Sequence, residues 1–229
     1  NLVVSGFTIK NLDFELTVTV PRNDIEDDQI GVLSNAFKMM GQETAMHPDQ
    51  LVFDLLRKGT TAPCFDGQPF FDTDHPLEIS EGNVVSVSNV DMSDPTGVPG
   101  WVLLDTSKVI KPFIFQQRKP YRFISIDDEE HPYVFENNTF VYGVEARVNA
   151  GYGLWQLAYA SDKALDANSF AAARAAMMSL KAPSGRPLGI LPDVMLVAPA
   201  FEDAARKLLN LGTSHYKDAV ELIVCPYMA

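Results

Sequence analysis

A strict alternation of apolar and polar residues near the start of the chain predicts its first element. The even positions from Phe14 to Val20 are apolar and the odd positions between them are polar, which is typical of a strand with two unlike faces. We expect a turn at Lys10 and Asn11 to join this strand to a short strand at residues 7–9. An isolated two-stranded ribbon is marginal in water, so we expect it to lean on another subunit.

A long helix is predicted next, over residues 24–58. Apolar residues recur there at helical spacing. Acids stand at the first turn and Arg57 and Lys58 at the last, which complements the helix dipole. Asn23 or Asp24 is the expected N-cap, and Gly59 suits a left-handed C-cap.

Pro48 interrupts this helical pattern. Because proline lacks a backbone donor and disfavours the α conformation of the residue before it, we expect a bend or break within about one turn of His47.

The rest of the chain divides by pattern into three parts. Residues 60–100 are rich in Pro and Gly and predict loops with one short strand near residues 84–90. Residues 101–160 predict an antiparallel meander of five or six strands, with breaks at 118–121 and 127–132. Residues 161–229 predict two helices, from about Asn168 and near Pro199, and two short strands. The fold class is therefore α+β.

The composition of the chain argues against several classes of function. The formal net charge is −12 and the sequence pI is about 4.6, which disfavours tight nucleic-acid binding through Lys and Arg. No run of apolar residues is long enough to cross a membrane. The two cysteines, Cys64 and Cys225, are too few for a disulfide framework and lack metal-site spacing. A cytoplasmic site of assembly fits best.

The most enzyme-like residues gather in one loop: Cys64, Asp66, Asp72, Asp74 and His75. One hypothesis is a metal-dependent hydrolase centred on Asp72, Asp74 and His75. The spacing matches neither a zinc nor a calcium pattern, so we favour a turn whose Asp and His side chains cap backbone groups.

Other candidates for chemistry are weaker still. His47, His131 and His215 have no second His or Cys at ligand spacing, and residues 127–130 are interpreted as an acidic hairpin tip. Nucleophile elbows and phosphate loops are absent. We assign no catalytic, cofactor-binding or metal residue.

Several long stretches carry a family resemblance. They are RNDIEDDQIG, HPDQLVFDLLRKGTTAPCFDGQPFFDTDHP, LLDTSKVIKPFIFQQRKP, GYGLWQLA, PLGILPDVMLVAPAFEDAARKLLN and VELIVCPYM. Together they resemble the major head (capsid) subunits of Mu-like bacteriophages and prophages, with the family's N-terminal region of several dozen residues missing.

The resemblance implies the Hong Kong 97-type phage capsid fold. Residues 1–22 would be the remnant of an extended-loop hairpin, 23–59 the spine helix, 60–100 a connection, 101–160 the meander of the peripheral and axial domains, and 161–229 the axial domain. The order of segments looks permuted relative to other capsids, so the strands at 101–105 and 219–225 are expected to be sheet neighbours.

The resemblance also implies a non-enzymatic function. The chain would assemble with itself into hexamers and pentamers of an icosahedral virion shell, in the bacterial cytoplasm, with portal and scaffold or head-assembly proteins as partners. The shell would enclose DNA without sequence-specific binding and would contact no membrane. Lys10 and Asn11 would be the pair to check for an isopeptide crosslink. The runner-up is an encapsulin-like compartment subunit that holds enzyme cargo.

Overall fold

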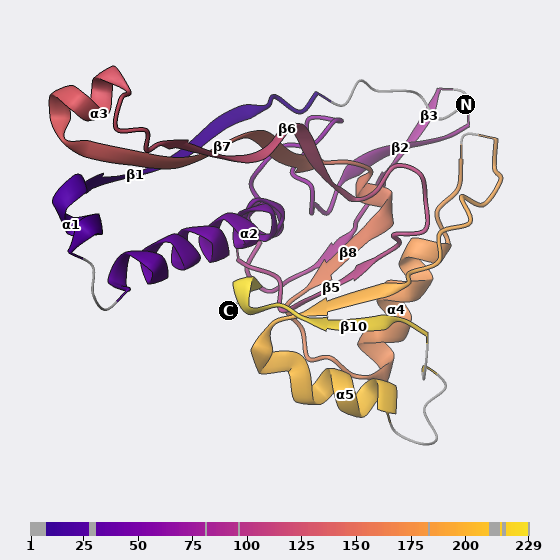
Figure 1. Ribbon diagram of the computed structural model, residues 1–229. Coiled ribbons are helices and arrows are strands. Elements are labelled where there is room, and N and C mark those ends of the chain that lie inside the picture. The colour runs from indigo at the N-terminus through magenta and orange to yellow at the C-terminus, as the bar shows by residue number, and fades with distance from the viewer. Residues whose placement is uncertain are drawn as a thin grey trace. The chain divides into compact units, whose positions relative to one another are not determined.

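The structure is a computed structural model, and the chain forms two compact units (Figure 1). Unit 1 comprises Asn1–Thr8, Val52–Ile114 and Gly151–Ala229; unit 2 comprises Ile9–Leu51 and Phe115–Ala150. The residues that the structure describes are 8–27, 31–80, 82–95, 97–182, 184–210, 216 and 219–228.

Unit 1 is built on a five-stranded sheet in the order β10-β9-β5-β8-β4, with a separate two-stranded sheet of β2 and β3. Helix α4 contacts β8, and α5 contacts β10. The bounds in unit 1 are β2 His75–Ser80, β3 Asn83–Val87, β4 Val90–Asp91, β5 Trp101–Leu104, η1 Trp155–Leu157, β8 Ala158–Ser161, α4 Ala167–Met178, β9 Val194–Val197, η2 Pro199–Phe201, α5 Glu202–Asn210, β10 Glu221–Val224 and η3 Pro226–Met228.

The core of unit 1 forms because the central strands are apolar on both faces. All four residues of β5 are buried, as continuous apolar runs are when both faces of a sheet are covered. The core continues into the aromatic side chains of Phe70, Phe170 and Trp155, each at most 1% exposed.

Unit 2 is a three-stranded sheet in the order β1-β7-β6, together with helical segments. Strand β1 runs antiparallel to β7 from the Leu12–Val148 pair to the Pro21–Thr139 pair. Helix α3 stands at the end of the long hairpin formed by β6 and β7 (Figure 1). The bounds are β1 Leu12–Pro21, α1 Arg22–Glu26, α2 Val32–Lys58, β6 Phe113–Ile126, α3 Pro132–Asn137 and β7 Thr139–Tyr152, with α2, β6 and β7 each extending into unit 1.

The strand predicted from the alternation of residues 14–20 is confirmed, but its predicted partner is not. Residues 8–11 are not in a strand, and β1 pairs with β7 instead. Phe7, the first residue of the expected short strand, lies outside the described residues. The alternation defines a strand but holds no information about which distant strand completes its hydrogen bonds.

The long helix differs from its prediction at both ends. A separate five-residue helix, α1, has Pro21 and not Asn23 or Asp24 as its N-cap, and α2 begins only at Val32. Gly59 has no left-handed φ. It is small for another reason, since a Cβ there would lie 2.5 Å from the Phe71 ring.

The predicted break at Pro48 is wrong, because α2 is helical from Val32 to Lys58 with Pro48 inside it. Aromatic packing holds the helix on both sides of the proline, since Phe53, after Pro48, stacks on Tyr227 with ring centroids 5.2 Å apart and two rings pack before it. Phe37 meets Tyr142 on β7, and His47 meets Phe14 on β1, with ring centroids 4.6 Å and 4.3 Å apart. A bend without an interruption stays a prediction.

The single meander predicted for residues 101–160 is also wrong. Its strands belong to two sheets, and β6 runs through Pro120 without the expected break. Proline is tolerated there because β6 is an edge strand. Residues 133–135, which fall between the predicted breaks and the end of the predicted meander, lie in helix α3 and not in a strand. Strands β5 and β10 share a sheet as foreseen, but β9 lies between them, so they are not neighbours.

The two helices and two strands predicted after residue 161 are confirmed as α4, α5, β9 and β10. None of the described helices is both long and apolar enough to span a membrane.

Candidate functional site

The loop before β2 is folded by a tight turn from Cys64 to Gln68. The Cys64 N–H donates to the Gln68 carbonyl at 2.8 Å, and the Gly67 N–H donates to the Cys64 carbonyl at 3.1 Å. Gly67 has φ +90°, a conformation that glycine adopts without steric cost. The turn therefore places Asp66, at its tip, beside the first residue of β2.

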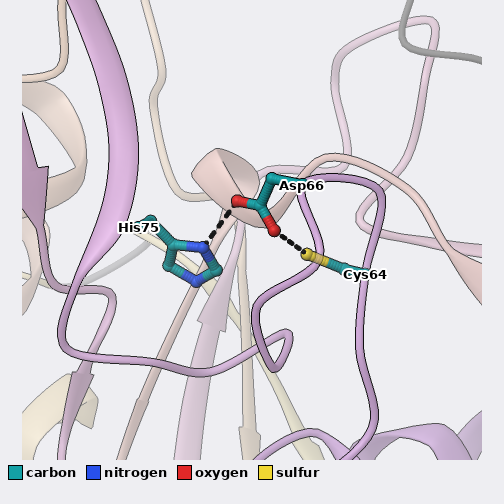
Figure 2. Close-up of side chains that lie close together, drawn as sticks. All are labelled: Cys64, Asp66 and His75. Atoms are coloured by element: carbon teal, nitrogen blue, oxygen red, sulfur yellow. Dashed lines mark hydrogen bonds and ion pairs between the residues drawn. The ribbon is translucent and has the colours of Figure 1, made fainter. Parts of the chain in front are cut away.

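Asp66 connects the two ends of this loop (Figure 2). Its Oδ1 accepts hydrogen bonds from the Cys64 thiol at 3.0 Å and from the Gln68 N–H at 3.1 Å, and its Oδ2 lies 2.8 Å from Nδ1 of His75. His75 is fully buried, and its Nε2 lies 3.3 Å from the Phe70 carbonyl oxygen. Both ring nitrogens therefore lie within hydrogen-bond distance of an oxygen, so the ring is held at two points.

The Cys64 thiol is held in its protonated form. Burial, followed by its hydrogen bond to Asp66, raises the pKa of Cys64 to about 12. Since the thiolate is the nucleophile and the metal ligand, this environment opposes both roles at neutral pH.

The ligand atoms of Cys64, Asp66 and His75 all lie within 4.8 Å of one another, and no other such group of three occurs among the residues that the structure describes. Each atom already has a hydrogen-bond partner within the loop. Cys64, Asp66 and His75 thus hold the turn to the start of β2 by hydrogen bonds. We call these three residues the clasp.

The hydrolase hypothesis centred on Asp72, Asp74 and His75 is not supported, because these three side chains do not converge. Asp72 caps its own turn, with Oδ1 accepting from the Thr73 N–H at 2.6 Å. Asp74 is exposed and accepts a hydrogen bond from the Gln68 side chain at 3.3 Å. The preferred interpretation, Asp and His side chains that cap backbone groups, is confirmed for Asp66 and Asp72.

The remaining histidines are not gathered into a site in the described parts of the chain. His131 is the N-cap of α3, where its Nδ1 accepts from the Tyr133 N–H at 3.2 Å. His215 lies outside the described residues.

His47 lies in a groove of unit 2, of about 280 Å³. Its Nδ1 lies 2.6 Å from the Tyr121 hydroxyl on β6. Burial lowers the pKa of His47 and raises the pKa of Tyr121, so both groups are neutral near pH 7. The groove is lined by Phe14, Glu15, Leu16, Glu43, Thr44, His47, Gln50, Tyr121, Val144 and Ala146.

No local pattern in the sequence indicates the His47–Tyr121 pair. The two residues are 74 positions apart, and neither belongs to a motif. Only the folded arrangement of β6 over α2 within unit 2 reveals them.

Comparisons with known proteins agree on one family. A family model described as "Mu-like prophage major head subunit gpT" matches residues 1–228. The chain is 36% identical to the major capsid protein of Escherichia phage Mu over 97% of its own length and 77% of that protein. It is 40% identical to the Mu-like prophage FluMu major head subunit of Haemophilus influenzae, over 90% of this chain and 68% of that one.

Solved structures show the same likeness. The capsid of bacteriophage JBD30 superimposes with a TM-score of 0.83 and 24% identity, over 97% of this chain and 77% of that one. A chain of the JBD30 procapsid has a TM-score of 0.77 and 38% identity, over 95% and 75% of the two chains. Both likenesses are to phage capsid proteins, and both curated relatives are head proteins, which favours a genome container over an encapsulin-like compartment.

Proposed function

The chain belongs to the Mu-like prophage major head subunit gpT family, and we propose that its function as a shell-forming capsid subunit involves no catalytic step. The observation that carries this proposal is the family match over residues 1–228, joined to the capsid fold over 97% of the chain. The Cys64–Asp66–His75 clasp supports it, because the most enzyme-like side chains are used to hold a loop together.

We assign the structural roles as follows. Residues 1–22 would belong to the extended loop, residues 23–59 to the spine helix, residues 60–100 to a connection, and residues 101–160 to the peripheral and axial domains. Residues 161–229 form the axial domain. The continuity of α2 through Pro48 suits a strut, because a helix without an interruption transmits load along its axis.

Assembly would proceed through hexamers and pentamers of the chain. Closed rings arise from head-to-tail contacts whose rotation closes, and many such contacts of moderate area add up to a stable shell. Portal and scaffold or head-assembly proteins are the further partners that we propose.

The DNA inside would be confined and not bound. A wall rich in Lys and Arg would hold DNA by releasing counterions, whereas this chain has a net charge of −12. The absence of a basic surplus would let the genome leave when the shell is opened.

Electron microscopy of the full-length protein tests the proposal. We expect shells, and shells incubated with duplex DNA should retain none after gel filtration at either low or moderate salt. A full-length protein that stays monodisperse, or shells that bind DNA and release it with a steep salt dependence, would contradict it.

A further inference from the structure

Two loops of unit 1 are fastened together beside the end of β5. Asp193 bridges them, with Oδ1 accepting from the Thr106 N–H at 2.6 Å and Oδ2 from the Thr106 hydroxyl at 2.8 Å. Asp105, which is fully buried, accepts from the Leu191 N–H at 2.9 Å. Lys108 closes the arrangement by donating to the Gly189 carbonyl at 2.5 Å.

Several further hydrogen bonds hold these two surface loops together. Burial disfavours a charged carboxylate at Asp105, but hydrogen bonds from Ser107 and from the backbone of Leu191 outweigh it and hold the pKa of Asp105 below its usual range. Asp105 Oδ1 accepts from both the N–H and the hydroxyl of Ser107, at 2.9 Å and 2.6 Å. Lys111 adds a hydrogen bond to the Thr106 carbonyl.

This rigid frame presents apolar side chains to solvent. Val109 is 99% exposed, Leu191 is 51% exposed and Ile110 is 36% exposed. We call these three residues the loop patch. Ordering a loop has an entropic cost, and a loop that is ordered before contact spares that cost when it binds. Lys108 and Lys111 flank the patch, so it is apolar with a cationic border.

A second surface, at α3 in unit 2, combines exposed aromatic side chains with acidic residues and so complements the loop patch. Helix α3 carries Phe135, 83% exposed, and Tyr133, 41% exposed, next to the acidic residues 127–130. We call residues 127–137 the tip. The tip is also fixed within unit 2: His131 caps α3, Asn138 closes it in the left-handed conformation, and Arg22 pairs with Glu129 at 2.8 Å.

Resting on the proposed capsid function, we propose that the loop patch of one subunit packs against the tip of a second copy of this chain. The apolar side chains would cover one another while Lys108 and Lys111 meet the acidic residues of the tip. Two loop patches would repel each other through their lysines, so the contact joins two different surfaces and can be repeated head-to-tail. Contacts of that kind generate rings when the rotation closes.

Disulfide trapping in the full-length protein tests the pairing. We expect Val109→Cys together with Phe135→Cys to give, on oxidation of assembled shells, a ladder of covalent multimers, since the paired Cβ atoms would come within about 4 Å. Each single variant is the matched control and should give no ladder, because Cys225 is buried and Cys64 is held as a thiol.

A charge substitution gives a second readout. Val109→Asp should reduce shell yield by about tenfold or more, because it places an unpaired carboxylate in an apolar contact. Val84→Asp is the control, since Val84 is 60% exposed on β3 outside the patch. Wild-type shells without a ladder in the double variant, or Val109→Asp shells at normal yield, would overturn the pairing and leave the capsid function standing. Failure of the wild-type protein to form shells would instead count against the proposed function and remove the basis of the pairing.

Discussion

The imidazole ring of His75 lies parallel to the indole ring of Trp155, with the ring centroids 4.1 Å apart and the planes 8° apart. Both side chains are buried in unit 1. The stack fixes the plane of the imidazole, and the plane in turn aims Nδ1 at Asp66 and Nε2 at the Phe70 carbonyl. The clasp is thus oriented by the core and not only by its own hydrogen bonds.

Replacing one carboxylate oxygen of Asp66 should therefore be costly. Asp66→Asn keeps the size of the side chain but turns one of its two acceptor oxygens into an N–H donor, so one of its hydrogen bonds to Cys64, Gln68 or His75 is lost, and we expect the free energy of unfolding to fall by about 1–3 kcal/mol. Urea denaturation followed by Trp fluorescence measures it. Asp74→Asn, an exposed aspartate of the same loop, is the control and should change stability by less than about 0.5 kcal/mol. Equal effects of the two variants would contradict the clasp.

Gly153 should not tolerate a side chain. A Cβ there would lie 1.9 Å from the backbone oxygen of Lys111, closer than any real contact, and the Gly153 N–H is already bonded to the Pro112 carbonyl at 2.8 Å. We expect Gly153→Ala to give little soluble protein, or a thermal midpoint lower by many degrees. Gly41→Ala is the control. It meets nothing within 4 Å on α2 and should stabilise the protein by about 0.5–1 kcal/mol.

Local patterns predicted those elements whose cause is local. Helix α4 begins at the capping box of Asp166 and Ser169, and α5 has acids in its first turn and Lys207 in its last, so both could be read from neighbouring residues. The pairing of β1 with β7 could not, because Leu12 and Val148 are brought together by the fold alone. The same holds for Pro120, whose tolerance depends on β6 being an edge strand.

The functional residues likewise include some that local sequence patterns indicate and others that only the fold brings together. Cys64, Asp66 and His75 lie within twelve positions, so the sequence drew attention to them, although it could not tell a clasp from a metal site. The Asp193–Thr106 bridge spans 87 positions, and no local pattern marks it. Family resemblance identified the function where the residues alone did not, because a shell subunit acts through surfaces that have no motif.

Pro48 should lower the free energy of unfolding of the isolated subunit. It cannot donate a hydrogen bond to the Thr44 carbonyl one turn earlier, and its ring crowds that carbonyl. We expect Pro48→Ala to stabilise the protein by about 1–3 kcal/mol in thermal or urea denaturation. Asp49→Ala, exposed on the next position, is the control and should change stability by less than about 0.5 kcal/mol. A destabilised Pro48→Ala variant would show that the proline is needed to shape α2.

His47 should make unit 2 sensitive to acid. Burial lowers its pKa, so the folded state holds fewer protons than the unfolded state around pH 6. The stability that depends on neutral His47 is fully present above the unfolded value of about 6.5 and is lost as pH falls below it. The charged groups that face His47 from the walls of the groove are Glu15 on β1 and Glu43 on α2, and the titratable hydroxyl of Tyr121 faces it from β6.

Urea denaturation at pH 7.5 and pH 5 measures this dependence, with the ring protons of His47 followed by NMR. Wild-type protein should lose stability on acidification, and His47→Gln should flatten the part of that loss that lies between pH 6.5 and 5. Met39→Gln is the control, since Met39 is a non-titrating side chain exposed on the same helix, and it should keep the wild-type slope. If the His47 ring titrates at or above 6.5, the glutamates outweigh its burial and acid would stabilise the contact of α2 with β1 and β6.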